Sequence, residues 1–254
     1  MSQAAAVTVA SQLARIRRRS NTEIEHEANR LLTSFVRKHG PLATPPIPVE
    51  DILEVYLRYT VDYDDLRIHL GTDAVLGALD ATSRRVIIDQ RLDPVDHPDQ
   101  EGRCRFTFAH ESGHAWLHVP LLASGNESVG LGQSEFVCWK RDTSDPLETE
   151  ASVFASCLLM PRSMVCQAWT ERLGNLRPLV FTESMVQPRK RGGWPVPIGE
   201  VLHGMMCPGT AWFRKVARIF APVFHVSVQA MMIRLQTLGL LRYGCVTGLA
   251  RLGL

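Results

Sequence analysis

The sequence predicts an α+β fold. Apolar residues recur at helical spacing between Ser20 and Gly40, short runs of β-type residues follow, and helical spacing returns from Arg103. With 45% hydrophobic and 21% charged residues, the 254-residue chain has the composition of a folded globular protein that can bury a real core. We therefore expect neither disorder nor a transmembrane span, because no apolar run approaches the roughly 18 residues that a span needs.

Charge and cysteine content narrow the classes of partner and compartment. The formal net charge is +2, so the overall field gives no reason to expect a direct nucleic-acid partner. The six cysteines form no C-x-x-C pair, and we expect reduced, mostly buried thiols. No positively charged segment precedes the apolar N-terminal residues, so a secretory signal is not expected and the predicted location is the cytoplasm.

The first element is a helix between Ser20 and Gly40. Ser20 followed by Glu23 has the sequence of a capping box, and apolar residues then recur at helical spacing until Gly40 ends the segment. Four prolines between Pro41 and Pro48 predict a loop. The apolar positions of Val49 to Leu57 predict a short second helix.

Three short strands follow. The segments Arg58 to Tyr63, Val75 to Asp80 and Arg85 to Asp89 are rich in β-type residues. Residues 81–83 join the last two segments, which predicts a hairpin.

The second half of the chain is predicted to be mainly helical. The most apolar helix of the first 120 residues extends from Arg103 to His118, and an irregular connection from Pro120 to Pro146 follows it. A further helix from Leu147 to Met160 ends at Pro161, and a short helix is expected after it.

The predicted domain organisation has four parts. Residues 1–20 form a flexible N-terminus and residues 21–173 form the main domain. Residues 174–208, with five prolines, are a linker or insertion. Residues 209–254 form a C-terminal helical region, with two helices between 212 and 241.

The residues that indicate chemistry are His110, Glu111 and His114, which form an H-E-x-x-H pattern inside an apolar helix. Residues four apart lie on one helix face, so both imidazoles can bind the same zinc ion. Glu111 is then directed at the attacking water and can take its proton, which is peptidase chemistry. The alternative is a pair of histidines held by core hydrogen bonds. Gly113 argues against this structural role of the histidines, because a glycine inside a helix indicates close packing against another element or a substrate.

A catalytic zinc ion needs a third protein ligand. His118 lies one more turn along the helix, and three residues spaced by four cannot all converge on one ion, so we expect His118 to contact a ligand or to pack. The start of the next helix offers Glu148 and Glu150. Glu148 extends the apolar stripe of that helix and is favoured, and Glu150 is the alternative.

Two blocks of the sequence resemble the ImmA/IrrE-type zinc metallopeptidases. Arg105 to His114, R-F-T-F-A-H-E-S-G-H, is similar to the R-F-T-x-A-H-E-x-G-H block of that family. Glu148 to Pro161, E-T-E-A-S-V-F-A-S-C-L-L-M-P, is similar to its E-x-x-A-N-x-F-A-x-x-L-L-M-P block. The resemblance implies a zincin-like core of the gluzincin type, with Zn²⁺ held by His110, His114 and Glu148. One position departs from the family, which usually has Asn or Asp where this chain has Ser152.

The resemblance also implies a function. It is that of a zinc endopeptidase with Glu111 as general base, which cleaves a helix-turn-helix (XRE-type) transcriptional repressor in a stress, prophage or mobile-element response. In related peptidases an extended substrate pairs with a sheet edge, and we expect Arg85 to Asp89 to be that edge.

Two alternatives have a different functional class or partner. One is a binding module without proteolysis, whose zinc site is degenerate or structural, and Ser152 is the residue that favours it. Direct DNA reading by the C-terminal helices is not expected, because the second of them carries only Arg234 as a basic residue. The other alternative is a toxin-like peptidase with an antitoxin partner.

Overall fold

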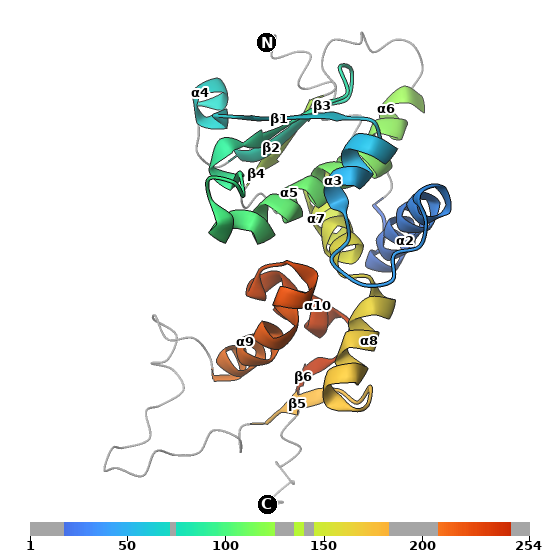
Figure 1. The fold of residues 1–254 in the computed structure, drawn as a ribbon, viewed down its shortest axis with the longest axis vertical. Helices are drawn as coiled ribbons and strands as arrows, with labels where there is room; N and C mark the ends of the chain where they lie inside the picture. Colours follow the sequence, from blue (N-terminus) through green and yellow to red (C-terminus); the bar gives the residue numbers. More distant parts are fainter. Residues whose placement is uncertain (1–17, 72–74, 125–134, 140–144, 183–207, 245–254) are drawn as a thin grey trace, which may run out of the picture.

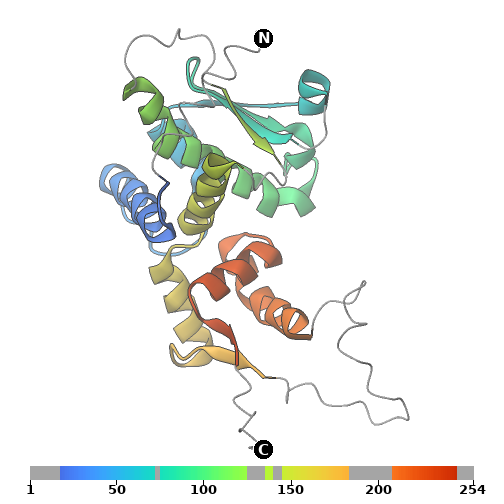
Figure 2. The same cartoon turned by 180° about the vertical axis from the view of Figure 1, so that it is seen from behind.

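The computed structural model describes residues 18–71, 75–124, 135–139, 145–182 and 208–244. The architecture is mixed α+β, as predicted. A four-stranded sheet with helices packed beneath it forms one end of the molecule, and a second group of helices with a two-stranded sheet forms the other end (Figures 1 and 2).

The elements of the first group have the following bounds: α2 Asn21–His39, α3 Val49–Asp51, η1 Ile52–Tyr56, β1 Thr60–Asp64, α4 Leu66–Leu70, β2 Val75–Asp80, β3 Arg85–Asp89, η2 Gln90–Leu92, η3 Pro98–Gln100, α5 Glu101–Gly113, η4 His114–His118, α6 Val119–Ser124, β4 Glu135–Trp139 and α7 Pro146–Leu159. Those of the second group are: α8 Arg162–Leu173, β5 Leu179–Phe181, α9 Pro208–Phe220, η6 Ala221–Phe224, α10 Val228–Thr237 and β6 Leu241–Tyr243.

Helix α2 begins and ends where the sequence predicts. The Ser20 hydroxyl accepts a hydrogen bond from the backbone N–H of Glu23, and the Glu23 carboxylate accepts one from the backbone N–H of Ser20, which completes the capping box. Gly40 then has φ of +101°, a conformation that favours glycine and ends the helix. The side chains that bury α2 against α7 recur every three or four residues: Ile24, Ala28, Leu31 and Phe35.

The four-stranded sheet has the order β1-β3-β2-β4. Strand β1 is parallel to β3, and β2 is antiparallel to both β3 and β4. The predicted hairpin of β2 and β3 is confirmed, with a turn at residues 81–84. Helix α5 packs against β2, β3 and β4, so one face of the sheet covers the H-E-x-x-H helix (Figure 1).

Two predictions about this sheet are wrong. Strand β3 (Arg85–Asp89) is not an edge strand, because β1 and β2 flank it, and the edges of the described sheet are β1 and β4. Strand β4 lies inside the segment Pro120 to Pro146, which was predicted to be irregular. The partner of β4 is β2, far earlier in the chain, and a five-residue strand with a distant partner leaves no local periodic signal.

The H-E-x-x-H helix is longer than predicted. It begins at Glu101, passes through the π-helical turn η4 at His114–His118, and continues as α6 to Ser124. The sequence predicts that the helix ends at His118 and that an irregular connection begins at Pro120. A proline is tolerated in the first turn of a helix, however, and the π turn immediately precedes α6.

The second group combines helices with a parallel strand pair. The rings of Trp169 in α8 and Phe220 in α9 stack with centroids 5.3 Å apart. Strands β5 and β6 pair in parallel, and β5 lies in the segment 174–208, where no strand was predicted. Residues 183–207 of that segment, and residues 1–17 of the predicted flexible N-terminus, lie outside the described part of the chain.

The predicted pair of C-terminal helices is confirmed. Ser227 caps α10 by accepting a hydrogen bond from the backbone N–H of Ala230, and Gly239 follows the helix with φ of +72°. No single described helix is long and apolar enough to cross a membrane, and the segments 209–224 and 228–237, which pass that test only together, are bent by 105° at their break. The described thiols are free, as predicted: Cys104, Cys157 and Cys166.

Arg234 points into the protein and joins the two groups of helices. Its side chain is 2% exposed, and its guanidinium donates hydrogen bonds to the Met160 carbonyl at 3.0 Å and to Glu25 Oε1 at 2.5 Å. The Cys157 sulfur lies 3.3 Å from the same guanidinium. The one basic residue of α10 is therefore committed to α2 and α7, and it is not available to face DNA.

Replacing Arg234 with alanine is expected to destabilise the fold, because Glu25 and the Met160 carbonyl lose a buried partner. Losing one member of such a pair costs about 3 kcal/mol in the free energy of unfolding. Chemical denaturation measures that free energy. Arg218→Ala removes an equal charge from an exposed position of α9 and should change it by less than about 0.5 kcal/mol. Equal stability of the two variants would contradict the role assigned to Arg234.

Candidate metal centre

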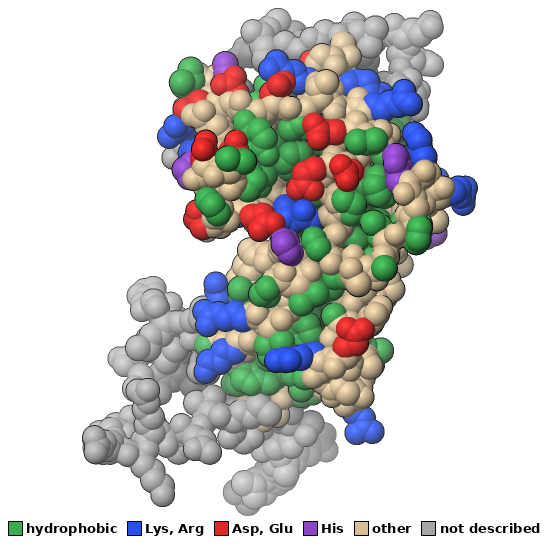
Figure 3. Space-filling model, in the orientation of Figure 1, with side chains coloured by type: hydrophobic (Ala, Val, Ile, Leu, Met, Phe, Trp, Pro, Cys, Tyr) green, Lys and Arg blue, Asp and Glu red, His purple; other side chains and the backbone are tan. Residues whose placement is uncertain are grey.

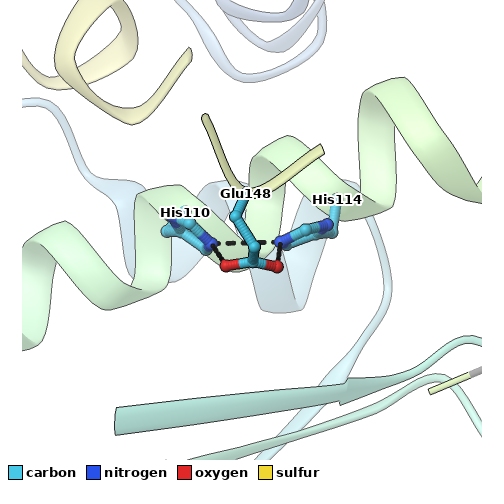
Figure 4. A group of neighbouring side chains, drawn as sticks. All are labelled: His110, His114 and Glu148. Carbon is cyan, nitrogen blue, oxygen red and sulfur yellow. Dashed lines mark hydrogen bonds and ion pairs between the residues drawn. The ribbon is translucent and has the colours of Figure 1, made fainter. Parts of the chain in front are cut away.

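His110, His114 and Glu148 bring three donor atoms together in the protein interior (Figure 4). Nε2 of His110 lies 3.0 Å from Nε2 of His114, and each faces one Glu148 oxygen at 3.1 Å. Ligand atoms placed 2.0–2.1 Å from a tetrahedral zinc ion lie about 3.3 Å from one another, close to these separations. The three residues predicted as ligands therefore form a group that can hold a metal ion.

Local structure places each of the three side chains. His110 lies in the last turn of α5 and His114 opens η4, so the four-residue spacing directs both rings to one side. Glu148 lies in the first turn of α7, where Asp145 caps the helix by accepting a hydrogen bond from the Leu147 N–H.

Gly113 lets the two helices approach each other. A Cβ atom at this position would lie 3.2 Å from both Ala151 Cα and the Phe154 ring, tighter than ordinary van der Waals contact. The close packing that this glycine predicted is therefore against another element, α7. This close packing brings Glu148, in the first turn of α7, next to His110 and His114.

Burial sets the charge state of the donors. Burial lowers the pKa of His114 to about 3, so its imidazole is neutral at physiological pH. Burial alone would raise the pKa of Glu148, but hydrogen bonds with His110 and His114 outweigh it and lower that pKa to about 2. A neutral imidazole and an ionised carboxylate are the forms that bind a divalent metal.

Glu111 is fully buried beside this group, and neither of its carboxylate oxygens has a hydrogen-bond partner among the described residues. Burial, and secondarily the charge of Glu148, raise the pKa of Glu111 well above its usual value. A buried carboxylate without a partner is costly, and a cation with an attached water would supply both the opposite charge and a donor. The residues present therefore fit a divalent metal ion.

The sheet contributes a residue that the sequence did not single out. A Cβ atom at Gly77 in β2 would lie 2.7 Å from Glu111 Oε1 and 2.7 Å from Thr107 Cγ2. The glycine therefore leaves room for the carboxylate between α5 and the sheet. Neither the spacing nor the composition around Gly77 indicates this contact, since it depends on how β2 crosses α5.

Ser152, which departs from the family pattern, lies next to His110. Its hydroxyl is 3.3 Å from Nδ1 of His110, on the side of the ring away from Glu148. Contacts of this kind orient a metal-binding histidine. Serine thus reaches His110 despite its short side chain, so Ser152 gives little support to a degenerate site.

Glu150 and His118 do not join the donor group. His118 Nδ1 lies 3.0 Å from His114 Nδ1, as expected for a residue that contacts a ligand. Glu150 faces His118 Nε2 at 3.4 Å and forms an ion pair with Arg19 at 2.9 Å. Sequence reasoning missed Arg19, which was assigned to the flexible terminus. The capping box at Ser20 indicates that Arg19 directly precedes an ordered helix, but it does not indicate that Arg19 contacts Glu150.

Comparison with known proteins places this centre within a recognised domain. The sequence model of the IrrE N-terminal-like domain, a peptidase family, matches residues 81–180. The match covers α5, η4 and α7, and with them His110, Glu111, His114 and Glu148. No curated protein matches the chain. Residues 81–180 of the chain are therefore similar to the IrrE N-terminal-like domain of a metallopeptidase family.

Proposed function

We propose that this protein is a zinc-dependent endopeptidase whose metal is held by His110, His114 and Glu148. The observation that carries the proposal is the buried carboxylate of Glu111 next to those three donors, which has no hydrogen-bond partner in the described part of the chain. Two histidines and one glutamate would hold a zinc ion and leave it able to bind water as well, as in catalytic rather than structural zinc sites.

The chain's own residues supply the proton transfers. Zinc, when bound, polarises the scissile carbonyl and lowers the pKa of the attacking water. Glu111 then takes a proton from that water as the new C–O bond forms. It delivers the proton to the departing nitrogen as the C–N bond breaks. Burial raises the pKa of Glu111, which makes its carboxylate a stronger base and suits a group that must take a proton from water.

The strand order of the sheet favours β4 rather than β3 as the place where an extended substrate would bind. Strand β4 is an edge of the described sheet, and its neighbour β2 carries Gly77, which lies against Glu111. A peptide that adds to this edge would satisfy its backbone groups and run beside the H-E-x-x-H helix. We infer that β4 provides the substrate-binding edge.

From the family resemblance we further infer that the substrate is a helix-turn-helix repressor in the cytoplasm, cut at one site in a stress, prophage or mobile-element response. The test uses zinc-loaded protein with a panel of purified repressors of this class and a proteome-derived peptide library, analysed by mass spectrometry. Metal-dependent cleavage at a defined bond supports the proposal. Repressor binding without any cleavage in either arm would favour the non-proteolytic binding module. Cleavage of other proteins only would favour the toxin-like peptidase.

Replacing Gly77 with alanine should slow cleavage without removing the metal. The new methyl group would displace the Glu111 carboxylate, and a misplacement of about 1 Å can cost roughly 100-fold in rate. Steady-state cleavage and zinc content are measured together. Thr107→Ser in the same background relieves the second clash and keeps the hydroxyl that donates to the Arg103 carbonyl. Full recovery in that double variant would show that Thr107, not Glu111, is the residue that Gly77 accommodates.

A further inference from the structure

A continuous series of contacts leads from His114 to the residues that precede α2. His114 Nδ1 lies 3.0 Å from His118 Nδ1, and His118 Nε2 lies 3.4 Å from Glu150 Oε2. Arg19 completes the series with two hydrogen bonds to Glu150, from its backbone N–H to Oε1 at 2.8 Å and from Nη1 to Oε2 at 2.9 Å. His114, His118 and Glu150 are buried, and Arg19 is half-buried.

Metal binding assigns a direction to every hydrogen bond in this series. If His114 binds the metal through Nε2, its neutral ring carries the proton on Nδ1 and donates it to Nδ1 of His118. His118 must then carry its own proton on Nε2, where it faces the Glu150 carboxylate. Glu150 accepts this proton and those of Arg19. One arrangement of protons is therefore consistent with all four contacts, and in it the lone pair of His114 Nε2 is directed at the other two donors, His110 and Glu148.

Arg19 also fixes the backbone around this series. Its Nη2 donates to the Leu117 carbonyl at 3.2 Å, so one guanidinium holds Glu150 of α7 and the π-helical turn that contains both histidines. Arg19 lies outside the matched domain at residues 81–180. Arg19 thus connects two of the three elements that carry the donors, η4 with His114 and α7 with Glu148.

We propose that Arg19, Glu150 and His118 are positioning residues that hold His114 in its metal-binding orientation and tautomer, so that the segment before α2 raises the metal affinity of the centre. The inference rests on the proposed function, since it takes His114 as a metal ligand. Partners that orient a metal-binding histidine typically contribute 10- to 100-fold to affinity. Arg19, at the far end of the series, should contribute about tenfold.

The test compares Arg19→Ala with Arg18→Ala. Arg18 is exposed and adjacent, so its replacement changes the net charge and the N-terminal segment equally but leaves the series intact. Zinc affinity is measured by competition with a chromogenic chelator, and the ligand geometry is followed by the visible spectrum of the Co²⁺-substituted protein. We expect about tenfold weaker zinc binding and an altered Co²⁺ spectrum for Arg19→Ala, and wild-type values for Arg18→Ala.

Further variants separate positioning from folding. Glu150→Gln keeps the shape and an acceptor oxygen but removes the charge, and should weaken zinc binding about 10- to 100-fold with one zinc still bound at saturation. Arg19→Lys retains the charge and should recover part of the affinity, and it replaces Arg19→Ala if the latter fails to fold. Circular dichroism of the metal-free proteins establishes that each variant is folded.

The outcomes distinguish the inference from the proposed function. The positioning role would be overturned if the wild-type protein and the folded variants bound zinc with equal affinity. The variants compared are Arg19→Ala or Arg19→Lys, Glu150→Gln and Arg18→Ala. That result would not contradict the proposed metal centre. Wild-type protein that binds neither zinc nor Co²⁺ would overturn both. Loss of affinity in the Arg18 and Arg19 variants alike would indicate a general effect of charge and would also contradict the inference.

Discussion

Zinc affinity is expected to fall by more than about 100-fold when Glu148 is replaced by glutamine. Losing a residue that only orients a metal ligand typically lowers affinity by about 10- to 100-fold, and losing a ligand itself should cost more. The two histidines would remain, 3.0 Å apart, without the carboxylate that faces both of them. Glutamine keeps the volume of the side chain, so the packing of α7 on α5 should persist. Elemental analysis and chelator competition measure the loss.

The neighbouring residues of α7 provide the controls for this change. Thr149 is exposed, and Thr149→Ala should bind zinc as the wild type does. Glu150→Gln should still bind one zinc ion per chain, more weakly. Loss of zinc in the Glu150 variant with normal binding in the Glu148 variant would reverse the assignment and restore the alternative that the sequence left open.

Cleavage is expected to fall by about 10²- to 10⁴-fold in Glu111→Gln, the range typical for loss of a general base. The amide occupies the same buried space but cannot take the proton of the attacking water. Zinc content should remain at one ion per chain, because Glu111 is not among the three clustered donors. The variant should also be at least as stable as the wild type without metal, since a buried carboxyl group with no hydrogen-bond partner among the described residues is costly.

Two measurements check the Glu111 prediction together. Initial cleavage rates give the loss of activity, and zinc analysis of the same sample shows that the metal is still present. Retained cleavage with bound zinc would refute the role of Glu111 as base. Loss of both activity and zinc would mean that Glu111 supports the metal rather than the proton transfer.

The local features of this protein could be predicted because they are encoded by residues close together in the chain. The capping box at Ser20 and Glu23 set the start of α2, and the hairpin of β2 and β3 followed from two strand patterns around a short turn. The four-residue spacing of His110 and His114 determined that both rings share a helix face. The apolar stripe of α7 favoured Glu148 over Glu150, and the family resemblance implied Glu148 as the third ligand.

The tertiary structure decided what depends on contacts between distant residues. Strand β4 and the β5–β6 pair form because their partners lie far away in the sequence, and the order β1-β3-β2-β4 placed β3 inside the sheet. Gly77 meets Glu111 only where β2 crosses α5, and Arg19 meets Glu150 across 131 positions.

The sequence by itself therefore determined that His110 and His114 share one helix face, because helical periodicity acts over a few residues. Only the tertiary structure decided which strands form the edges of the described sheet and which residue meets Glu150. Those outcomes depend on packing between α5, α7, α2 and the sheet, which no periodicity within one segment encodes.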